Sequence, residues 1–358
     1  MTDLLLVGPL AHPALAAALG IRGQAESVPG RLTGGLRAGI DRHGWPVLHP
    51  GAGEVAAIRT AMTPALARYA AVFGLAPLPH AAGRVMGAGL TGPDGISWSA
   101  QNWPAALAAG LARQVLAQPP SLDPAQIAQR LPQMAVWEDS RLRAAGGPSS
   151  GGDLVTPRTP GDVTVTARDQ AYAGFFSAEA WDLTHRRHDG GASPQMRREG
   201  FVMGDAVCVL PWDKQRDRVL VVEQFRFAPA MRDDPQPWLI EPIAGRIDAL
   251  ETPEIAARRE AIEEAGLTLG ELIPAIHHYP SPGAVAEFLY LYVALADLPD
   301  GVAGIHGLAG EAEDIRGHLL DRADLSRMVM AGQITNGPLA MLSLWLDQRA
   351  EALRRDAD

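Results

Sequence analysis

A stretch rich in glycine, proline and serine near the middle of this 358-residue chain constrains its fold more than any other feature. Residues 144–161 read AAGGPSSGGDLVTPRTPG, a composition typical of a linker and not of a segment that builds a core. We therefore expect two domains, residues 1–143 and 162–358. Each is of a size that a single hydrophobic core supports.

The composition indicates an ordinary globular protein, with 47% hydrophobic and 20% charged residues. The formal net charge of −10 argues against non-specific binding to a nucleic-acid backbone. An anionic substrate would need local arginines or a metal ion to be attracted. We expect no nucleic-acid partner.

The N-terminus is apolar but does not have the pattern of a signal peptide. It contains Asp3, Pro9 and Pro13 and lacks a basic first segment. No run reaches the ~18 apolar residues of a membrane span. Cys208, the single cysteine, lies in the apolar run DAVCVLPW, which favours a small buried side chain over a nucleophile. We expect a cytoplasmic protein in a reducing compartment, without a membrane partner.

Hydrophobic periodicity predicts a mixture of strands and helices in both halves, and therefore an α+β fold. In the first half a strand over residues 3–8 precedes a helix that ends at Gly20, and a second helix is capped by Thr63 with Pro64 in its first turn. The second half is predicted to contain several strands, a helix near residue 260 and two C-terminal helices joined near Gly337; the strands cover residues 162–186, 205–212, 217–227, 238–247 and 287–295.

The helix near residue 260 gathers like charges on one face. Thr252 is a good N-cap and Gly266 a good C-terminal stop, so the helix should run over residues 253–265. Glu260, Glu263 and Glu264 then lie at i, i+3 and i+4 on one face. A bound Mg²⁺ would relieve their repulsion, and a solvated acidic face would also accommodate it. The helix alone leaves both readings open. The spacing of two isoleucines, at positions 255 and 262, predicts that they mark its buried face.

The spacing around this helix resembles the signature of the Nudix hydrolases. Gly245, Glu251, Arg259–Glu260, Glu263–Glu264 and Gly266–Leu267 stand at its fixed positions, and only Ala261 departs mildly, where a bulkier aliphatic residue is usual. The resemblance implies an α/β/α sandwich with a mixed sheet. It also implies a Mg²⁺ site, with Mn²⁺ as a possible substitute, held against a diphosphate.

The same resemblance assigns roles to these residues. Glu260 and Glu264 would be the main metal ligands, and Glu263 would share or bridge the ions and take part in catalysis. Arg259 would orient the carboxylates, and Glu251 would be structural. Gly245 would let the backbone turn, so that the carbonyl group of Ala244 faces the metal.

Over residues 162–353 the chain resembles the ADP-ribose pyrophosphatase subgroup of that family, through segments such as YAGFFSAEAWDLTHRR, VEQFR, SPGAVAEF and GIHGLAGEAEDIR. The resemblance implies that Glu311 is a general base and Glu313 a further metal contact. It places Ser281 and Gly283 in a loop near the distal ribose, and Glu287 in the lining of the site. It also implies that Arg198 and Arg226 contact substrate and that Phe175 stacks on adenine. It also implies a homodimer in which each adenine pocket borrows residues from the partner subunit.

The first half resembles the gamma-glutamylcyclotransferase (AIG2-like) family faintly. Residues 7–10, VGPL, occupy the strand–turn motif of that family, but Phe73 is followed by Gly74 where the catalytic acid would stand. The resemblance implies a small, β-barrel-like α+β domain that has lost its catalytic residue and serves packing, regulation or binding.

Taken together, these features predict Mg²⁺-dependent hydrolysis of ADP-ribose to AMP and ribose 5-phosphate. A pyrophosphatase for another nucleoside diphosphate sugar, such as GDP-mannose, is the alternative with the same chemistry. A non-catalytic nucleotide-sugar sensor is the alternative of another class. Some proteins that pair these two domains carry a tellurite-resistance label, for which the sequence offers no physical route beyond detoxifying hydrolysis.

Overall fold

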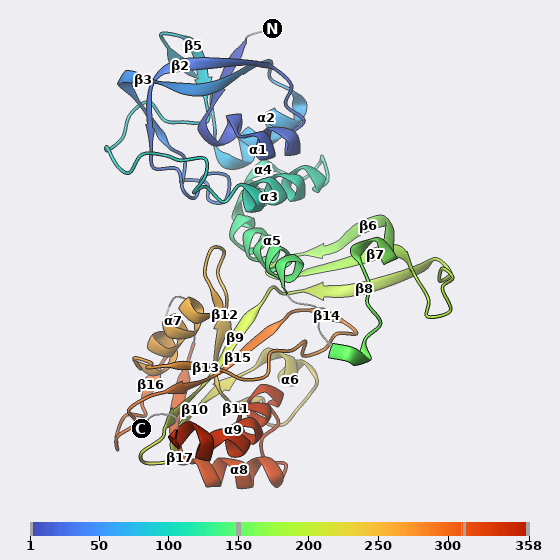
Figure 1. The fold of residues 1–358 in the computed structure, drawn as a ribbon, viewed down its shortest axis with the longest axis vertical. Coiled ribbons are helices and arrows are strands. Elements are labelled where there is room, and N and C mark those ends of the chain that lie inside the picture. Colours follow the sequence, from blue (N-terminus) through green and yellow to red (C-terminus); the bar gives the residue numbers. More distant parts are fainter. Residues whose placement is uncertain (1–2, 148–151, 309, 311–312, 356–358) are drawn as a thin grey trace. The chain divides into compact units, whose positions relative to one another are not determined.

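The computed structural model describes residues 3–147, 152–308, 310 and 313–355. The chain divides into two compact units, Met1–Pro157 and Arg158–Asp358 (Figure 1). The division falls inside the segment whose composition is typical of a linker. No helix in the described ranges is both long enough and apolar enough to cross a bilayer.

The N-terminal unit contains a five-stranded sheet in the order β2–β3–β1–β5–β4. Strand β1 pairs antiparallel with β3 and parallel with β5, and its four residues are all buried. Strands β2 and β4 are the two edges, so the described strands form an open sheet, and the expected barrel-like closure is not confirmed. The strands are β1 (Leu4–Val7), β2 (Gln24–Thr33), β3 (Val47–Thr60), β4 (Leu78–His80) and β5 (Gly83–Met86).

Helices of this unit begin and end where capping residues allow. The Thr63 hydroxyl accepts a 3.1 Å hydrogen bond from the Leu66 N–H at the start of α2, as the sequence predicts, and Gly74 ends that helix with φ +70°. The helical segments are η1 (Gly8–Ala11), α1 (Pro13–Ala18), α2 (Pro64–Phe73), α3 (Ala105–Ala117), α4 (Pro124–Gln129), α5 (Leu131–Gly146) and η2 (Gly152–Leu154).

The C-terminal unit is built on a mixed sheet in the order β13–β15–β9–β10–β17–β16. Strands β15 and β9 are parallel and the other pairs are antiparallel, while β11 pairs with β10 and β12 pairs with β9. The strands are β9 (Ala206–Asp213), β10 (Arg218–Phe225), β11 (Trp238–Glu241), β12 (Ile243–Arg246), β13 (Leu272–Pro274), β15 (Leu289–Leu295), β16 (Ile305–His306) and β17 (Ile315–Asp321).

Alternation along the central strands buries both faces of this sheet. On β9, Val207 and Val209 pack in the core under α7 (Pro253–Ala265), whereas Cys208 and Leu210 pack in the core under α8 (Arg322–Met330) and α9 (Gly337–Arg355). Helices therefore cover the two faces, which confirms the expected α/β/α sandwich (Figure 1). The short helix α6 (Phe227–Met231) follows β10, and α9 begins at Gly337, as predicted.

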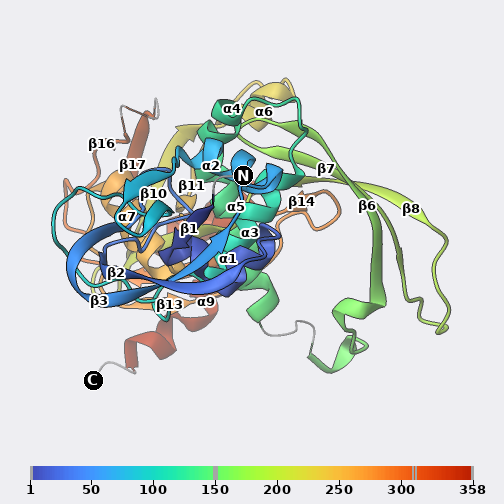
Figure 2. The ribbon, with the colours of Figure 1, turned by 90° about the horizontal axis from the view of Figure 1, so that it is seen from above.

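A second sheet has the order β14–β8–β7–β6 and extends from the same unit. Its strands β6, β7 and β8 run side by side as a long ribbon in both views (Figures 1 and 2). Most residues of β6 and β8 are exposed or only half-buried. The strands are β6 (Val163–Ala173), β7 (Ser177–His185), β8 (Met196–Val202) and β14 (Val285–Ala286), and η3 (Pro160–Asp162) precedes β6.

Helix α7 packs through alanines, contrary to the prediction from the sequence. Ile255 and Ile262 are 53% and 59% exposed, so the prediction that they mark the buried face is wrong. The buried positions are Ala256, Ala257, Ala261, Glu264 and Ala265. Small side chains let the helix backbone approach the sheet closely, and this approach brings the acidic face of α7 against β12, with which it makes extensive contact.

Candidate active site

Capping fixes the length and direction of α7. The Thr252 hydroxyl accepts a 3.3 Å hydrogen bond from the Ile255 N–H, Pro253 occupies the first turn, and Gly266 ends the helix with φ +63°. Both boundaries agree with the prediction. The helix therefore presents Glu260, Glu263 and Glu264 toward the end of β12.

Arg259 connects the carboxylates of this region. Its guanidinium group donates two hydrogen bonds to Glu251, at 3.0 and 2.9 Å, one to Glu260 at 2.6 Å and one to Glu263 at 3.1 Å. A further bond of 2.9 Å reaches the backbone carbonyl of Arg246. These bonds raise the pKa of Arg259, the bond to Glu251 contributing most. One planar cation thus holds three carboxylates and the end of a strand in fixed relative positions.

The carboxylates of Glu264 and Glu260 are buried, and the positive charge near them does not offset the loss of solvation. Glu264 is 2% exposed, and desolvation raises its pKa to about 8 although the Ala244 N–H donates a 3.0 Å hydrogen bond to it. Desolvation also raises the pKa of Glu260 to about 7, against the opposing effect of Arg259. The carboxylate of Glu313 raises both pKa values further, so it lies near the pair.

This cluster fits a hard divalent cation in residue type and in charge. Oxygen donors with raised pKa values are groups that a cation would return to the ionised form. In the described ranges, three or more acidic, histidine or cysteine side chains do not converge on one point. Instead, Arg259 binds oxygens of Glu260 and Glu263, and Glu264 turns toward the Ala244 N–H.

Gly245 is required for close approach and not for a turn. It lies within β12 and has no left-handed φ, contrary to the expectation that it turns the backbone. A Cβ atom at this position would lie 1.9 Å from the carboxyl carbon of Glu260. The missing side chain therefore makes the space that the Glu260 carboxylate occupies.

An aromatic cluster adjoins the end of β12. Phe175, which is 62% exposed, and Phe176 belong to the turn between β6 and β7, and their ring centroids are 4.9 Å apart. The guanidinium carbon of Arg246 lies 4.6 Å from the Phe175 centroid and 5.3 Å from that of Phe176. Burial raises the pKa of Glu287, and the charge of Arg246 lowers it, so Glu287 faces the same region. Sequence reasoning missed Arg246, although its position directly after Gly245 could have suggested it.

The loop that carries Ser281 and Gly283 joins this cluster through the backbone. The Phe201 N–H donates a 2.7 Å hydrogen bond to the carbonyl of Ala284, and β14 continues the loop parallel to β8. The Phe176 and Phe201 rings are 5.5 Å apart. Ser281 and Gly283 are both exposed.

Arg198 lies on the other face of the second sheet. It pairs across the strands with Trp181, whereas Phe201 pairs with Ala178, and side chains alternate between faces along β8. Arg198 is exposed and donates a 2.9 Å hydrogen bond to the carbonyl of Arg197. Within one chain the structure therefore does not bring Arg198 together with Phe176 and Phe201.

Arg226 lies close to the acidic cluster but is held by a residue that sequence reasoning missed. It donates bonds of 2.8 and 2.6 Å to one oxygen of Glu241, which is 3% exposed, and Asn336 donates a 3.1 Å bond to the other oxygen. Desolvation raises the pKa of Glu264, and the charge of Arg226 opposes part of that rise. Arg226, Glu241 and Asn336 are polar residues inside or next to apolar segments, and that pattern could have suggested that they pair in the fold.

Glu311 and Cys208 remain from the sequence analysis. Glu311, the expected general base, lies outside the described residues. Cys208 is buried in β9, and burial raises the pKa of its thiol, which fits a structural role.

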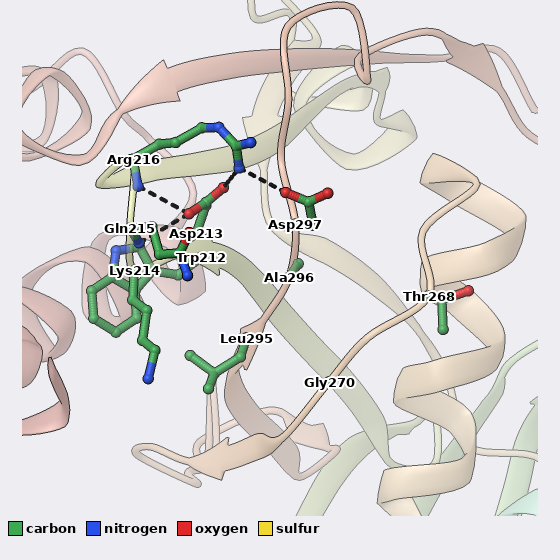
Figure 3. A pocket seen from close by; sticks show the side chains of 10 residues that line it. All are labelled: Trp212, Asp213, Lys214, Gln215, Arg216, Thr268, Gly270, Leu295, Ala296 and Asp297. Atoms are coloured by element: carbon green, nitrogen blue, oxygen red, sulfur yellow. Dashed lines mark hydrogen bonds and ion pairs between the residues drawn. The ribbon is translucent and has the colours of Figure 1, made fainter. Parts of the chain in front are cut away.

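The pocket drawn in Figure 3 lies at the far end of β9 and is lined by residues of the β9–β10 turn and the end of β15. In it Arg216 is paired with Asp213 and Asp297, and none of the predicted site residues lines it. It therefore offers no counterpart to the acidic cluster.

Comparisons with known proteins cover the same part of the chain. The family model described as NUDIX domain matches residues 203–333. The ADP-ribose pyrophosphatase of Escherichia coli strain K12 is 40% identical over 195 residues, 54% of this chain and 92% of that protein. That of Haemophilus influenzae is 35% identical, over 52% of this chain and 86% of that protein. The GDP-mannose pyrophosphatase of Enterobacter sp. strain 638 is 31% identical, over 46% of this chain and 84% of that protein.

Proposed function

This chain belongs to the Nudix family, as a Nudix hydrolase, and on that basis we propose that it hydrolyses ADP-ribose to AMP and ribose 5-phosphate. The observation that carries the proposal is the set of three carboxylates, Glu260, Glu263 and Glu264, gathered beside β12 by Arg259 and by alanine packing. The extent of the similarity to an ADP-ribose pyrophosphatase supports the choice of substrate.

The proposed reaction joins a water oxygen to one phosphorus atom and breaks its bond to the bridging oxygen, which leaves as part of the other phosphate. A divalent cation, Mg²⁺ or Mn²⁺, would neutralise the diphosphate and lower the pKa of the attacking water when bound. Glu260, Glu263, Glu264, Glu313 and the carbonyl group of Ala244 are the proposed groups that would hold it. Glu311 is the proposed acceptor of the water proton.

Other residues of the chain would bind and orient the substrate. Arg259 holds the carboxylates together and aligned, a positioning role that its bonds to Glu251, Glu260 and Glu263 support. Phe175 would stack on the adenine, and the loop of Ser281 and Gly283, with Glu287, would line the distal ribose. Arg226 would face the phosphates, oriented by Glu241.

We propose a homodimer in which the second sheet packs against its counterpart. Several large apolar side chains of this sheet and of its β6–β7 turn are exposed in the single chain, among them Tyr172, Phe175 and Phe201. Arg198, which faces away from Phe176 and Phe201 in its own chain, would then serve the partner's pocket. Light scattering coupled to size exclusion would measure the mass, and a monomer at micromolar concentration would contradict this part of the proposal.

For the N-terminal unit we propose a non-catalytic gamma-glutamylcyclotransferase-like domain. Gly74, at the left-handed end of α2, stands where an acid would be needed, which supports the absence of that chemistry. A cytoplasmic location is part of the same proposal.

The test is to incubate the purified protein with Mg²⁺ and a panel of ADP-ribose, ADP-glucose, GDP-mannose and NADH, and to separate the products by chromatography. We expect AMP and ribose 5-phosphate from ADP-ribose, and no products with EDTA. Glu264→Gln should lower kcat by several orders of magnitude, whereas Glu271→Gln, on an exposed residue beside β13, should leave it unchanged. Near-normal turnover by the Glu264 variant would refute the proposed metal site.

Two outcomes would favour the alternatives. Preference for GDP-mannose would keep the chemistry and change the substrate, and the similarity to a GDP-mannose pyrophosphatase is the observation behind this reading. Binding of a nucleotide sugar without turnover of any substrate would favour the sensor.

A further inference from the structure

We propose that the N-terminal unit contains a binding site for a compact oxyanion, formed by the side chains of Arg130 and Trp137. Phosphate, sulfate and carboxylate groups share the chemistry that this site would recognise. Arg130 lies at the junction of α4 and α5, and Trp137 lies two turns further along α5. The site is separate from the acidic helix, and the proposal does not depend on the proposed hydrolysis.

Two of the three nitrogen atoms of the Arg130 guanidinium group lack a hydrogen-bond acceptor. Nη1 donates a 3.1 Å hydrogen bond to the side-chain oxygen of Gln118, at the end of α3. Nε and Nη2 are buried and bond to no group in the part of the chain that the structure describes. Burial lowers the pKa of Arg130, because it disfavours the charged form. An acceptor with negative charge would offset this cost better than a neutral acceptor.

The open edge of Arg130 is the edge that carboxylates occupy on other arginines of this protein. Nε and Nη2 donate in parallel along one side of the guanidinium plane and match two oxygens of one oxyanion. Arg259 binds Glu251 through this edge, with bonds of 3.0 and 2.9 Å. Arg322 binds Asp217 through the same edge, with two bonds of 2.9 Å. The unfilled edge of Arg130 therefore fits an acceptor with two oxygens.

Trp137 adds a further donor beside the guanidinium group. Its side chain is 1% exposed, and its indole N–H bonds to no acceptor among the described residues. The guanidinium carbon of Arg130 lies 6.0 Å from the centre of the Trp137 ring. A buried indole N–H usually finds a partner, so this one also indicates a missing acceptor. Neighbouring side chains thus lack the same kind of partner.

A second arginine lies at the same end of α3. Arg68 donates hydrogen bonds of 2.7 to 3.3 Å to three consecutive backbone carbonyls, the first of which belongs to Gln118. Its Nε is buried and finds no acceptor within the described ranges. Gln118 therefore links two guanidinium groups, that of Arg68 through its carbonyl and that of Arg130 through its side chain. Two positive charges close together favour an anion at this position.

The acidic residue next to Trp137 is engaged elsewhere. The carboxylate of Glu138 accepts a 2.7 Å hydrogen bond from the side chain of Gln114. It also fills the space beside Gly110, where a Cβ atom would lie 1.8 Å from one of its oxygens. Residues 1–157 contain eleven arginines and nine acidic residues, although the whole chain has a net charge of −10. The charge of this unit therefore does not repel an anion.

An oxyanion would reach the two donors of Arg130 if α4 moved. Arg130 ends this helix, and only Ile127 of its six residues is buried. Few buried contacts hold α4, so it can shift without opening the core of the unit. The hydrogen bond from Arg130 to Gln118 would keep the guanidinium group in place during this movement.

The test follows the indole N–H of Trp137 by nuclear magnetic resonance in the full-length protein labelled with nitrogen-15. Inorganic phosphate is added at constant ionic strength without divalent metal, and Trp137→Phe identifies the signal. We expect a saturable shift of this signal in wild type and in Arg113→Met, a control on an exposed arginine of α3. Arg130→Met should weaken phosphate binding about 10- to 100-fold, the range for lost charge-assisted hydrogen bonds. An equal response of Arg130→Met and wild type would overturn the proposal.

Other anions test the class of ligand. Sulfate and acetate should shift the same signal, because each offers two oxygens to the guanidinium edge. Chloride should require a concentration at least about 10-fold higher, since it offers no oxygen pair. Equal effects of chloride and phosphate would overturn the preference for an oxyanion. A signal that no anion shifts would show that ordered water occupies these donors, and the site would be refuted.

Two further measurements separate binding from a structural role of Arg130. Arg130→Lys keeps the charge but loses the parallel donors, so it should also bind phosphate at least about 5-fold more weakly than wild type. Without phosphate, the melting temperature of Arg130→Met should be close to that of wild type, because the removed edge has no partner there. Phosphate should then raise the melting temperature of wild type more than that of the variant. Equal destabilisation of Arg130→Met with and without phosphate would assign Arg130 a structural role and overturn the proposal.

Discussion

Replacing Gly245 with alanine should separate the geometry of the site from the stability of the fold. The new Cβ would lie 1.9 Å from the carboxyl carbon of Glu260, whereas an ordinary contact between carbon atoms is about 3.5 Å. The group in the way is the far end of a flexible side chain, so the carboxylate would move by about 1.6 Å and β12 would stay in place. A misplacement of about 1 Å can cost about 100-fold in rate, so we expect kcat to fall by at least that factor.

The free energy of unfolding should change little in the same variant. Alanine restricts the unfolded chain and favours folding by about 0.4–1 kcal/mol, which offsets part of the strain. Urea unfolding should therefore give a change within about 1 kcal/mol of wild type. Gly337→Ala is the matched control, because a Cβ there meets nothing within 4 Å. Normal kcat in Gly245→Ala, or a loss of stability large enough to explain the lost activity, would refute the reasoning.

Two further perturbations concern ion pairs of the same unit. Arg226→Met leaves the 3% exposed Glu241 with Asn336 as its remaining described partner and should cost about 3 kcal/mol in urea unfolding. Glu241→Gln removes the negative charge but keeps an amide oxygen that can accept from the more exposed arginine, so it should cost only about 1–2 kcal/mol; equal costs would contradict this asymmetry. Burial opposes ionisation of Asp213, but hydrogen bonds from the backbone and side chain of Arg216 and from neighbouring N–H groups outweigh it and hold the pKa at about 2. A depressed folded pKa stabilises the fold above the unfolded value of about 3.9, so thermal stability should fall as pH drops from about 4 toward 2. Asp213→Asn should remove part of this slope, and an unchanged slope would show that other groups cause it.

The sequence predicts helix ends and strands correctly where one local interaction, such as a helix cap, is enough to determine them. The boundaries of α2 and α7 agree with their caps, because a threonine hydroxyl and a left-handed glycine satisfy backbone groups within a few residues. The sequence predicts strands over residues 205–212 and 217–227, which agree with β9 and β10; the centres of both strands are apolar because helices cover both faces of the sheet.

The sequence-based predictions were wrong where the outcome depends on the surface against which a residue packs. Ile255 and Ile262 are more hydrophobic than alanine and were expected to be buried, yet the sheet selects the alanine face of α7, because only small side chains permit the close approach. Gly245 was expected to turn the backbone. It is needed instead because its missing side chain leaves room for the Glu260 carboxylate, a contact that no local pattern encodes.

By itself, then, the sequence of this protein determined its division at a Gly/Pro/Ser-rich segment, the limits of its capped helices and the spacing of Glu260, Glu263 and Glu264 on one helix face. The tertiary structure alone decided which carboxylates Arg259 bonds, namely Glu251, Glu260 and Glu263. It also decided that Glu241 and Asn336 hold Arg226, and that Arg246 meets Phe175. The physical reason is the distance along the chain over which each kind of interaction acts. Caps and periodicity act over a few residues, whereas desolvation, ion pairing and stacking depend on groups that approach only when β6, β12 and α7 come together.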